Sequence, residues 1–321
     1  MGGYTPPFTV SSKSVNLVAD ICTRLVSIGI YGEPIPPSLR RGNRIRSIQS
    51  SLAIENNSLT LDEVTDVIDG KRVLGSPREI LEVKNAFECY AIIDELDPCS
   101  LKDLLRTHGI MMNGLQDDAG QLRHVRVGVF AGRTIVHSAP PPELVPGLMS
   151  DLMSWLESSG DHPLIKSCVF HYEFERIHPF SDGNGRTGRL WHTLILSKWH
   201  EEFSWIPIET MVRRRQDEYY EAIATSNDKG DSEPFIEFML ESILAAIDDM
   251  VSQHITDVPG LSEIEARILE MIRMGTFGNT NGASKALGIS ERTVQRALDS
   301  LKEKNLIVRE GSRKAGAWRA L

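Results

Sequence analysis

The sequence predicts a mainly α-helical protein with one β-hairpin in its core and a helix-turn-helix followed by two strands at its C-terminal end. Three observations support this fold class. Apolar residues recur mostly at helical spacing from Ser38 onward, β-branched residues alternate within residues 126–137, and the balance of charges changes after residues 257–260. We expect three regions: an N-terminal helical region over 1–110, a core domain over 111–257 and a C-terminal domain over 258–321.

The composition bounds the class of protein. The 321 residues are 41% hydrophobic and 25% charged, which is enough apolar sequence for two or three cores. No run of 18 apolar residues is present to span a bilayer, and the first residues lack the basic-then-apolar pattern of a signal peptide. The cysteines are scattered without a C-x-x-C pair, as is typical of reduced thiols: Cys22, Cys89, Cys99 and Cys168. We therefore expect a cytoplasmic protein without a membrane role.

Helices are predicted in turn along the N-terminal region. An amphipathic stretch from Val15 to Ile28 predicts the first helix, and the prolines within residues 34–37 end it. Residues Thr60 to Glu63 form a capping box that opens a later helix. Pro77 suits the first turn of another helix, which we expect to run to Asp94.

The hairpin is predicted over residues 126–137. Their β-branched side chains alternate around Ala131 and Gly132, which are small enough for a tight turn. Taken alone, this pattern predicts only a hairpin that covers the core.

Residues 178–189 bring together residue types that phosphate chemistry uses. His178 titrates near neutral pH, so it can accept a proton from an attacking hydroxyl group. Asp182 offers carboxylate oxygens of the kind through which Mg²⁺ bridges a protein and substrate phosphates. Without such a function, the same segment is a Gly-rich turn with an interior histidine and arginines in surface ion pairs.

The glycines and arginines of this segment favour an anion site. The run Gly183-Asn184-Gly185 can direct successive backbone N–H groups at one point, because glycine tolerates positive φ. A helix predicted from Arg186 to Trp199 would direct the positive end of its dipole there. Arg186 and Arg189 are three residues apart and share a face of this helix, so we expect both guanidinium groups to bind one polyphosphate.

The segment matches the pattern His-x-Phe-x-Asp/Glu-Gly-Asn-Gly-Arg-x-x-Arg at every defined position. In this it resembles the Fic-domain proteins. The resemblance also includes flanking stretches: residues 140–146, 171–177, 219–220, Asn227 and 234–236. It covers roughly residues 38–247, about two thirds of the chain.

This resemblance implies a fold and an activity. The fold is the helical bundle of Fic domains with a hairpin flap, so that residues 111–257 become the catalytic core. The activity is transfer of AMP from ATP to a serine, threonine or tyrosine hydroxyl of a target protein, with Mg²⁺ or Mn²⁺ as cofactor and pyrophosphate as product. The flap over residues 126–137 would register the target by strand addition. A homodimer is implied as well, since related proteins often dimerise.

The resemblance also implies a role for each site residue. His178 would be the general base, Asp182 the metal ligand, and the backbone of Gly183, Asn184 and Gly185 the site of the α-phosphate. The remaining contacts would be Arg186 and Arg189 on the β- and γ-phosphates, and Tyr220 and Asn227 in the adenine pocket. The alternative for this pair is an amphipathic helix from Arg213 to Ser226 without any ligand.

A second motif lies near the N-terminus. Residues Ser51 to Asn56 carry Ser-x-x-x-Glu-Asn, which resembles the inhibitory-helix motif of many Fic proteins. A carboxylate that pairs with a motif arginine occupies the guanidinium group that the γ-phosphate of ATP needs. The resemblance therefore implies that Glu55 pairs with Arg189 and holds ATP in an unproductive pose. Glu55 also fits a plain helix end before the turn at residues 56–58. The same carboxylate can orient water, so removal of AMP from a modified protein is an alternative activity.

Residues 262–321 differ in charge from the rest of the chain. They carry 11 Lys and Arg against 7 Asp and Glu, a net charge of +4, whereas the remaining residues carry 24 against 37. Their pattern predicts a helix, a short helix with a tight turn, a third helix and a pair of strands: 264–274, 282–290, 291–304, 306–308 and 317–319. This order resembles winged helix-turn-helix domains.

Two partners fit such a domain. For DNA, the contacting residues would be Arg292, Thr293, Gln295 and Arg296 in a groove, with Arg313 and Lys314 near phosphates. Alternatively the domain contacts a protein or packs a dimer, because this fold is often reused. A charge of +4 is small, and three acidic residues lie on or near the third helix, so attraction to phosphates would be weak. If the domain does bind DNA, the second class of function is a DNA-bound regulator whose Fic domain senses nucleotide or modifies a partner.

Overall fold

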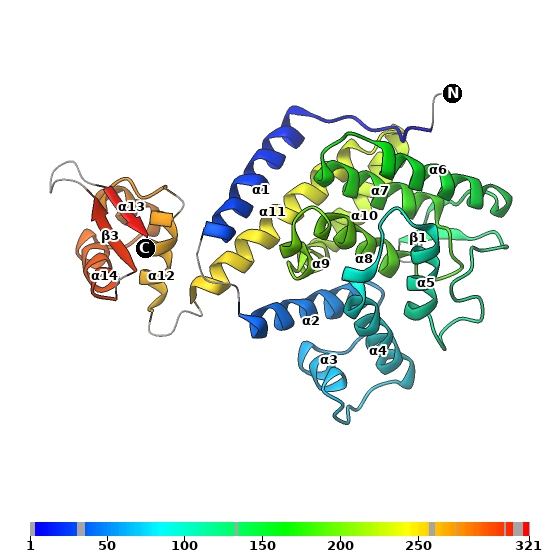
Figure 1. Ribbon diagram of the computed structural model, residues 1–321, viewed down its shortest axis with the longest axis horizontal. Helices are drawn as coiled ribbons and strands as arrows, with labels where there is room; N and C mark the ends of the chain where they lie inside the picture. Colours follow the sequence, from blue (N-terminus) through cyan, green and yellow to red (C-terminus); the bar gives the residue numbers. More distant parts are fainter. Residues whose placement is uncertain are drawn as a thin grey trace. The chain divides into compact units, whose positions relative to one another are not determined.

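The computed structural model describes residues 4–30, 36–131, 134–256, 261–273, 275–304, 306–310 and 317–320. Within these ranges the protein is mainly helical, with two antiparallel pairs of strands (Figure 1). Its contacts divide the chain into two compact units, one of residues 1–21 and 36–246 and one of residues 22–35 and 247–321. The predicted helical fold with a hairpin is confirmed. The domain boundaries expected after residues 110 and 257 remain predictions.

The N-terminal helices include the predicted ones, although the first runs from Ser12 to Ile30 rather than from Val15 to Ile28, and the one at Pro77 ends at Ala91 rather than at Asp94. They are α1 (Ser12–Ile30), α2 (Pro37–Ile54), α3 (Leu61–Ile68), α4 (Pro77–Ala91) and α5 (Leu101–Met111). The Thr60 hydroxyl accepts from the backbone N–H of Glu63, and the Glu63 carboxylate accepts in return from Thr60, which confirms the capping box. Pro77 lies in the first turn of α4, where its missing N–H costs no hydrogen bond. α2 packs against α3, α4 and α8, which brings residues near position 50 to the centre of the first unit.

The hairpin consists of β1 (Gly128–Ala131) and β2 (Thr134–Ser138), which pair antiparallel. Gly128 lies opposite Ser138, and the register shifts between Val129 and Phe130. The predicted hairpin is therefore confirmed, and the Gly132 of its expected turn lies outside the described residues.

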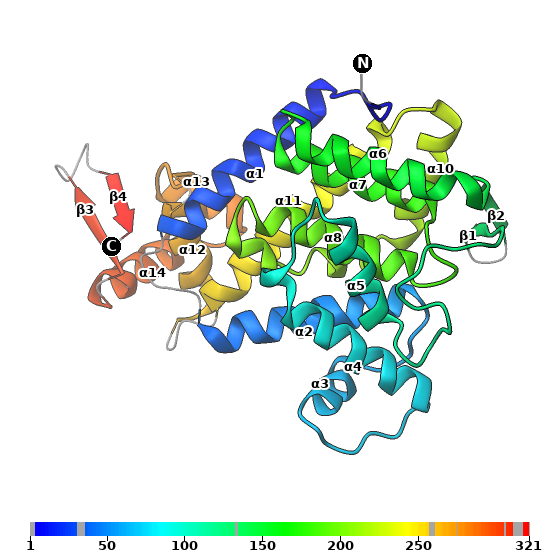
Figure 2. The same cartoon turned by 45° about the vertical axis from the view of Figure 1, so that its right-hand side comes forward.

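The core of the first unit is built around two helices, α7 (Pro163–Ile177) and α8 (Asn184–Ser197), which pack directly on each other. Both are buried on nearly all sides, as expected of helices at the centre of a bundle. The other helices of this part of the unit are α6 (Val145–Ser158), α9 (Ile208–Arg214), α10 (Gln216–Lys229) and the first part of α11 (Glu233–Thr256) (Figure 2). Three short 3₁₀ helices lie between helices of this unit: Ile93–Glu95, Pro142–Leu144 and Glu201–Ser204. The loop of residues 178–183 joins α7 to α8.

The second unit contains α12 (Glu263–Arg273), α13 (Thr280–Leu287), α14 (Glu291–Glu303), β3 (Ile307–Glu310) and β4 (Ala317–Ala320). The side chains of Asn279 and Ser290 cap α13 and α14. Val294, Leu298 and Leu301 lie on one face of α14 and are buried in a small apolar core. β3 and β4 pair antiparallel, so the predicted order of elements is confirmed, whereas Arg313 and Lys314 lie outside the described residues. In the described part of the chain, no helix is long and apolar enough to cross a membrane.

Candidate active site

The loop between α7 and α8 has a left-handed residue at each end. His178, which ends α7, has φ 50°, and Gly183, which caps α8, has φ 80°. The left-handed backbone of Gly183 favours glycine, and a Cβ there would lie 2.6 Å from Sδ of Met112, so that the Met112 side chain would have to shift. The left-handed conformation of His178 is uncommon for a residue with a side chain. Local sequence and close packing together therefore fix the course of this loop.

Asn184 braces the loop through its side chain. Its amide oxygen accepts a 2.9 Å hydrogen bond from the backbone N–H of Phe180, and its amide nitrogen donates a 2.9 Å bond to the carbonyl of Phe180. The side chain is buried. Asn184 thus acts in the structure as a loop brace, and only its backbone is left for an anion.

A cavity of about 210 Å³ lies against this loop. Its lining includes most of the predicted site residues: Glu55, His178, Asp182, Gly183, Asn184, Gly185, Arg189, Tyr220 and Asn227. Further lining residues are Gly128, Glu175, Arg176, Ser181, Tyr219 and Ile223. Ser51 and Arg186 do not line the cavity. The structure therefore gathers residues from α2, the loop, α8 and α10 around one space.

His178 is held in its neutral form at physiological pH. Burial lowers its pKa to about 4, and the Arg123 guanidinium contributes to the decrease. Its Nδ1 lies 3.4 Å from the backbone carbonyl of Glu175. Because a carbonyl oxygen only accepts, this contact favours a proton on Nδ1 and leaves the lone pair on Nε2. A neutral imidazole with a free lone pair is the form that accepts a proton.

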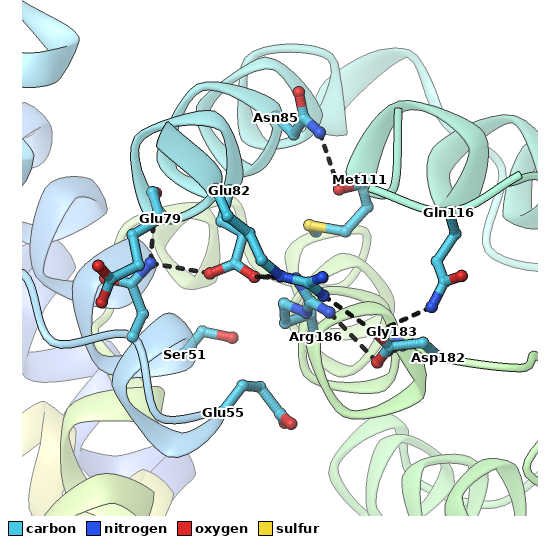
Figure 3. Close-up of polar contacts among 12 residues, drawn as sticks. Ser51, Glu55, Glu79, Glu82, Asn85, Met111, Gln116, Asp182, Gly183 and Arg186 are labelled. Carbon is cyan, nitrogen blue, oxygen red and sulfur yellow. Dashed lines mark hydrogen bonds and ion pairs between the residues drawn. The ribbon is translucent and has the colours of Figure 1, made fainter. Parts of the chain in front are cut away.

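Asp182 lies at the start of α8 with both oxygens in contact with donors. Oδ1 accepts a 2.6 Å bond from the Gly183 N–H, and Oδ2 accepts a 3.3 Å bond from Gln116 (Figure 3). Burial raises the pKa of this carboxyl, but Arg186, the Gly183 N–H, Gln116 and Arg78 outweigh burial, so that its pKa lies below the usual value. Asp182 is therefore ionised near neutral pH.

The donor set around Asp182 fits a metal that is shared with a ligand. Among the described residues, no group of three or more His, Cys, Asp or Glu side chains is arranged to hold a metal ion. Mg²⁺ commonly binds one or two carboxylates together with substrate phosphates and water. A single ionised carboxylate on the cavity wall matches that pattern, and a metal ion would compete there with the Arg186 and Arg78 guanidinium groups for its oxygens.

Two nitrogens of the Arg189 guanidinium group donate to the C-terminal end of α2. Its Nε donates a 3.0 Å bond to Oγ of Ser51, and its Nη2 donates to the Ser51 carbonyl at 3.0 Å and to Oε1 of Glu55 at 2.7 Å. Burial lowers the pKa of Arg189, but the Glu55 carboxylate and its neighbours outweigh burial and raise it. The guanidinium is 3% exposed, against 35% for the Glu55 side chain. The two residues predicted to form an ion pair do so.

Arg186 points elsewhere. Its Nη2 is 3.4 Å from Oδ1 of Asp182 and its Nη1 is 3.6 Å from Oε1 of Glu82 on α4. Figure 3 shows the guanidinium group between these two carboxylates. Arg186 and Arg189 thus contact carboxylates on different helices. Binding of both to one polyphosphate, as the spacing predicts, would require Arg186 to move toward the cavity.

Residues of α10 also line the cavity. Tyr220, Ile223 and Asn227 follow one another at helical spacing and all line the cavity. The amide oxygen of Asn227 accepts a 2.8 Å bond from the hydroxyl of Tyr172. The predicted pair therefore faces the same space as His178.

Two buried residues that support the loop were not predicted. Nε of Arg123 donates a 2.7 Å bond to the carbonyl of His178, and its other nitrogens donate to the carbonyls of Val125, Pro140 and Ile177. His108 accepts at Nδ1 from the Gly120 N–H, so its Nε2 donates to the Asp182 carbonyl at 2.9 Å. Neither residue belongs to a motif, and both lie more than 50 positions from their partners in the loop. No local sequence pattern reveals them.

Glu175 is a further carboxyl group on the cavity wall that was not predicted. Burial raises its pKa to about 7, and the Glu55 charge adds to this, although Arg189 opposes it. It lies three residues before His178, within the stretch that ends α7. The packing of α7 against α8 places the Glu175 side chain on the cavity wall.

The comparisons with known proteins agree with this geometry. The model of the Fic/DOC family matches residues 98–196. The crystal structure of a Fic family protein from Desulfovibrio desulfuricans G20 is 43% identical with a TM-score of 0.75, and the match covers 99% of this chain and 98% of that one. A structure of Fic-1 from Caenorhabditis elegans is 23% identical with a TM-score of 0.63, covers 76% of this chain and 74% of that one, and is similar in fold.

Curated relatives match a shorter part of the chain. Protein adenylyltransferase Fic of Culex quinquefasciatus is 29% identical over 216 residues, which are 64% of this chain and 41% of the relative. Protein adenylyltransferase fic-1 of Caenorhabditis elegans is 29% identical over 212 residues, 62% of this chain and 40% of the relative. The chain thus spans about two fifths of the length of these relatives. Together with the full-length similarity to the Desulfovibrio desulfuricans structure, these matches show that the chain belongs to the Fic/DOC family.

Proposed function

We propose that this protein transfers AMP from ATP to a hydroxyl side chain of a target protein, and that Glu55 inhibits the transfer in cis. The observation that best supports this is one cavity lined by the neutral imidazole of His178, the ionised carboxylate of Asp182 and the backbone of residues 183–185. Relatives over part of the chain carry the name protein adenylyltransferase.

In the proposed reaction, the target oxygen attacks the α-phosphorus of ATP. Nε2 of His178 takes the hydroxyl proton while the target oxygen forms a bond to the α-phosphorus. The bond between the α-phosphorus and the oxygen that bridges it to the β-phosphorus breaks, and pyrophosphate leaves. The backbone N–H groups at the start of α8 stabilise the charge that develops on the α-phosphate oxygens. Asp182 would hold Mg²⁺ or Mn²⁺, which neutralises charge on the phosphates.

The adenine ring would lie against α10. Tyr220 and Asn227 line the end of the cavity formed by this helix, and Ile223 between them supplies an apolar surface. Sites of this kind combine apolar walls with a few polar groups that fix orientation.

Autoinhibition is proposed to act through Arg189. The γ-phosphate of ATP needs a guanidinium group, and Arg189 already donates to Glu55 and to Ser51. The Glu55 carboxylate and an incoming phosphate are both negatively charged, so they compete for the N–H donors of the Arg189 guanidinium group. ATP would then bind in a pose that does not align the α-phosphate with His178.

Labelled ATP tests both parts of the proposal. We expect little transfer of label to proteins of a cell lysate, in the presence of Mg²⁺, by the wild-type chain and strong transfer by Glu55→Gly. Adding His178→Ala to Glu55→Gly should abolish it. Equal labelling by the wild type and Glu55→Gly would overturn the inhibitory role, and labelling that persists without His178 would overturn the proposed base.

Removal of AMP is a second candidate activity of the same site. Glu55 lines the cavity with its side chain 35% exposed, so its carboxylate can orient water toward a bound phosphate. A target labelled by Glu55→Gly and then incubated with wild type would lose its label if this activity is present. Retention of the label would argue against it.

We propose that residues 262–321 form a winged helix-turn-helix domain that contacts a partner. The exposed side of α14 carries Arg292, Gln295 and Arg296, with Thr293 partly buried beside them. Gln295 donates to Asp299 at 2.9 Å, and Glu291 and Glu303 lie on the same helix, which weakens the case for DNA relative to protein. A sequence-specific shift of DNA at physiological salt would instead favour the DNA-bound regulator.

The hairpin is the proposed site for the target. β1 begins at Gly128, which itself lines the cavity, so an extended segment of a target paired along the hairpin would lie near His178. Backbone pairing gives affinity with little dependence on sequence. A proposed homodimer is testable by sedimentation of the full chain.

A further inference from the structure

A third carboxylate, that of Glu82 on α4, lies among the groups that surround Asp182. Its Oε1 is 3.6 Å from Nη1 of Arg186 and 3.4 Å from Nε of Arg78. Its Oε2 accepts a 2.9 Å hydrogen bond from the side chain of Asn57. The side chains of Glu82 and Arg186 are 12% and 4% exposed, so solvent and salt screen their interaction poorly. Figure 3 shows Glu82 and Asp182 on opposite sides of Arg186.

The same two arginines also contact Asp182. Nη2 of Arg186 is 3.4 Å from Oδ1, and Nη2 of Arg78 is 3.6 Å from Oδ2. Two guanidinium charges are thus shared between two carboxylates. A guanidinium group and a metal ion compete for the oxygens of one carboxylate, because both are cations that occupy its lone pairs. The closer the two guanidinium groups lie to one carboxylate, the more available the other carboxylate is to a metal ion.

We infer that Glu82 is a positioning residue that draws the Arg186 and Arg78 guanidinium groups from Asp182 and thereby allows Asp182 to bind the metal of a metal–nucleotide complex. The inference rests on the proposed role of Asp182 in AMP transfer. Without the Glu82 charge, both arginines would turn fully to Asp182, and the oxygens of Asp182 would be less available to a cation.

The contact with Asn57 makes Glu82→Gln a selective test. The amide oxygen of glutamine still accepts from Asn57, so this substitution removes the charge and keeps that hydrogen bond. The contact is worth keeping because the backbone N–H of Asn57 donates to the Leu52 carbonyl at 3.1 Å and closes the end of α2, two residues after Glu55. Any effect of Glu82→Gln is thereby separated from a shift of the inhibitory helix.

The test is Mn²⁺ binding by the full chain carrying Glu55→Gly, measured by electron paramagnetic resonance with a non-hydrolysable ATP analogue bound. We expect Glu82→Gln to raise the Kd for Mn²⁺ about tenfold. The corresponding change in binding free energy is only a part of the interaction between a carboxylate and a guanidinium group about 4 Å apart. Glu88→Gln removes an equal charge from an exposed position of the same helix and should leave the Kd unchanged. Asp182→Asn should abolish this binding.

Arg78 provides the decisive second variant, since its side chain is 57% exposed and its replacement should not disturb folding. Arg78→Gln alone should lower the Kd for Mn²⁺, and combined with Glu82→Gln it should restore most of the lost affinity. A purely structural role of Glu82 predicts that Arg78→Gln lowers the Kd by the same factor with and without Glu82→Gln, whereas the inference predicts a larger factor in the Glu82→Gln background. An unchanged Kd in Glu82→Gln, or no effect of Arg78→Gln in either background, overturns the inference. Mn²⁺ binding that is insensitive to Asp182→Asn overturns instead the proposed metal site.

Discussion

Nη2 of Arg189 donates a 2.7 Å hydrogen bond to Oε1 of Glu55, a residue 134 positions earlier in the chain. Charge-assisted bonds of this kind are among the stronger hydrogen bonds in proteins. The arginine is buried and the glutamate is partly exposed, so the pair can separate by movement of the glutamate alone. Inhibition of this kind depends on the strength of the contacts between α2 and Arg189, and Ser51 supplies two of these contacts.

Ser51→Ala should relieve inhibition in part. The variant removes the acceptor for Nε of Arg189, a bond to a charged group that is worth about 1.5–3 kcal/mol, but leaves the Ser51 carbonyl as an acceptor for Nη2. We expect AMP transfer from labelled ATP above the wild-type level and below that of Glu55→Gly. Ser50→Ala, which removes a neighbouring hydroxyl that contacts Thr210, is the control. Transfer by Ser51→Ala no higher than by this control would show that the Ser51 hydroxyl does not contribute to holding Arg189.

Gly183→Ala should abolish transfer in the Glu55→Gly background. Left-handed backbone costs a residue with a side chain about 1–2 kcal/mol, and here the added methyl group would also meet Sδ of Met112 at 2.6 Å. Gly230→Ala is a matched control, because Gly230 has φ 66° and a Cβ added there would have no atom within 4 Å. Both variants should unfold at lower temperature than the parent. If Gly230→Ala loses as much activity as Gly183→Ala, the loss reflects general destabilisation rather than the loop.

The pH dependence of kcat/KM for transfer should show no apparent pKa near 6.5, the value of an unperturbed histidine. Burial lowers the pKa of His178 to about 4, so the neutral base persists from pH 8 down to about pH 5. Glu55 raises the pKa of His178 slightly, so Glu55→Gly moves the profile further toward acid. The measurement is kcat/KM of Glu55→Gly against pH. An apparent pKa near 6.5 would show that the imidazole is not buried in the active form.

Stability should fall as the pH decreases from about 6.5 to 4. Burial lowers the pKa of His108 and of His192 to about 4, so the unfolded chain binds more protons than the folded chain in this window. A shift from 6.5 to about 4 corresponds to roughly 3 kcal/mol for each buried histidine. Glu175, whose pKa burial raises to about 7, acts in the opposite direction. Denaturant unfolding at pH 7, 5.5 and 4.5 measures the balance, and a constant free energy of unfolding would contradict it.

The sequence predicted the parts of the site that are local in the chain. The loop from His178 to Arg189 and the helix end at Glu55 follow from short motifs, because glycine, caps and helical spacing act over a few residues. The supports of the loop come from distant elements. Arg123 and His108 meet the loop, and Glu82 meets Arg186 on α8, only after the helices pack. Arginine and glutamate are also residue types that are common on a protein surface.

The direction of Arg186 was also beyond the sequence. Its spacing from Arg189 places both on one side of α8, but the choice between the cavity and Glu82 depends on α4, about a hundred residues earlier. Helical spacing fixes where a side chain leaves the helix and not which partner it meets.

Arg123→Lys should lower the rate of transfer with little effect on ATP binding. Arg123 donates to the carbonyls of His178, Pro140 and Val125 at 2.7, 2.6 and 2.9 Å, and the single ammonium group of lysine cannot reach three acceptors placed around a planar fork. Because these bonds hold the left-handed backbone of His178, we expect kcat to fall about 10- to 100-fold in the Glu55→Gly background, while KM for ATP changes little. Arg106→Lys, at an exposed pair with Glu95, is the control. A rise in KM with unchanged kcat would place Arg123 among the groups that bind nucleotide rather than among those that position the base.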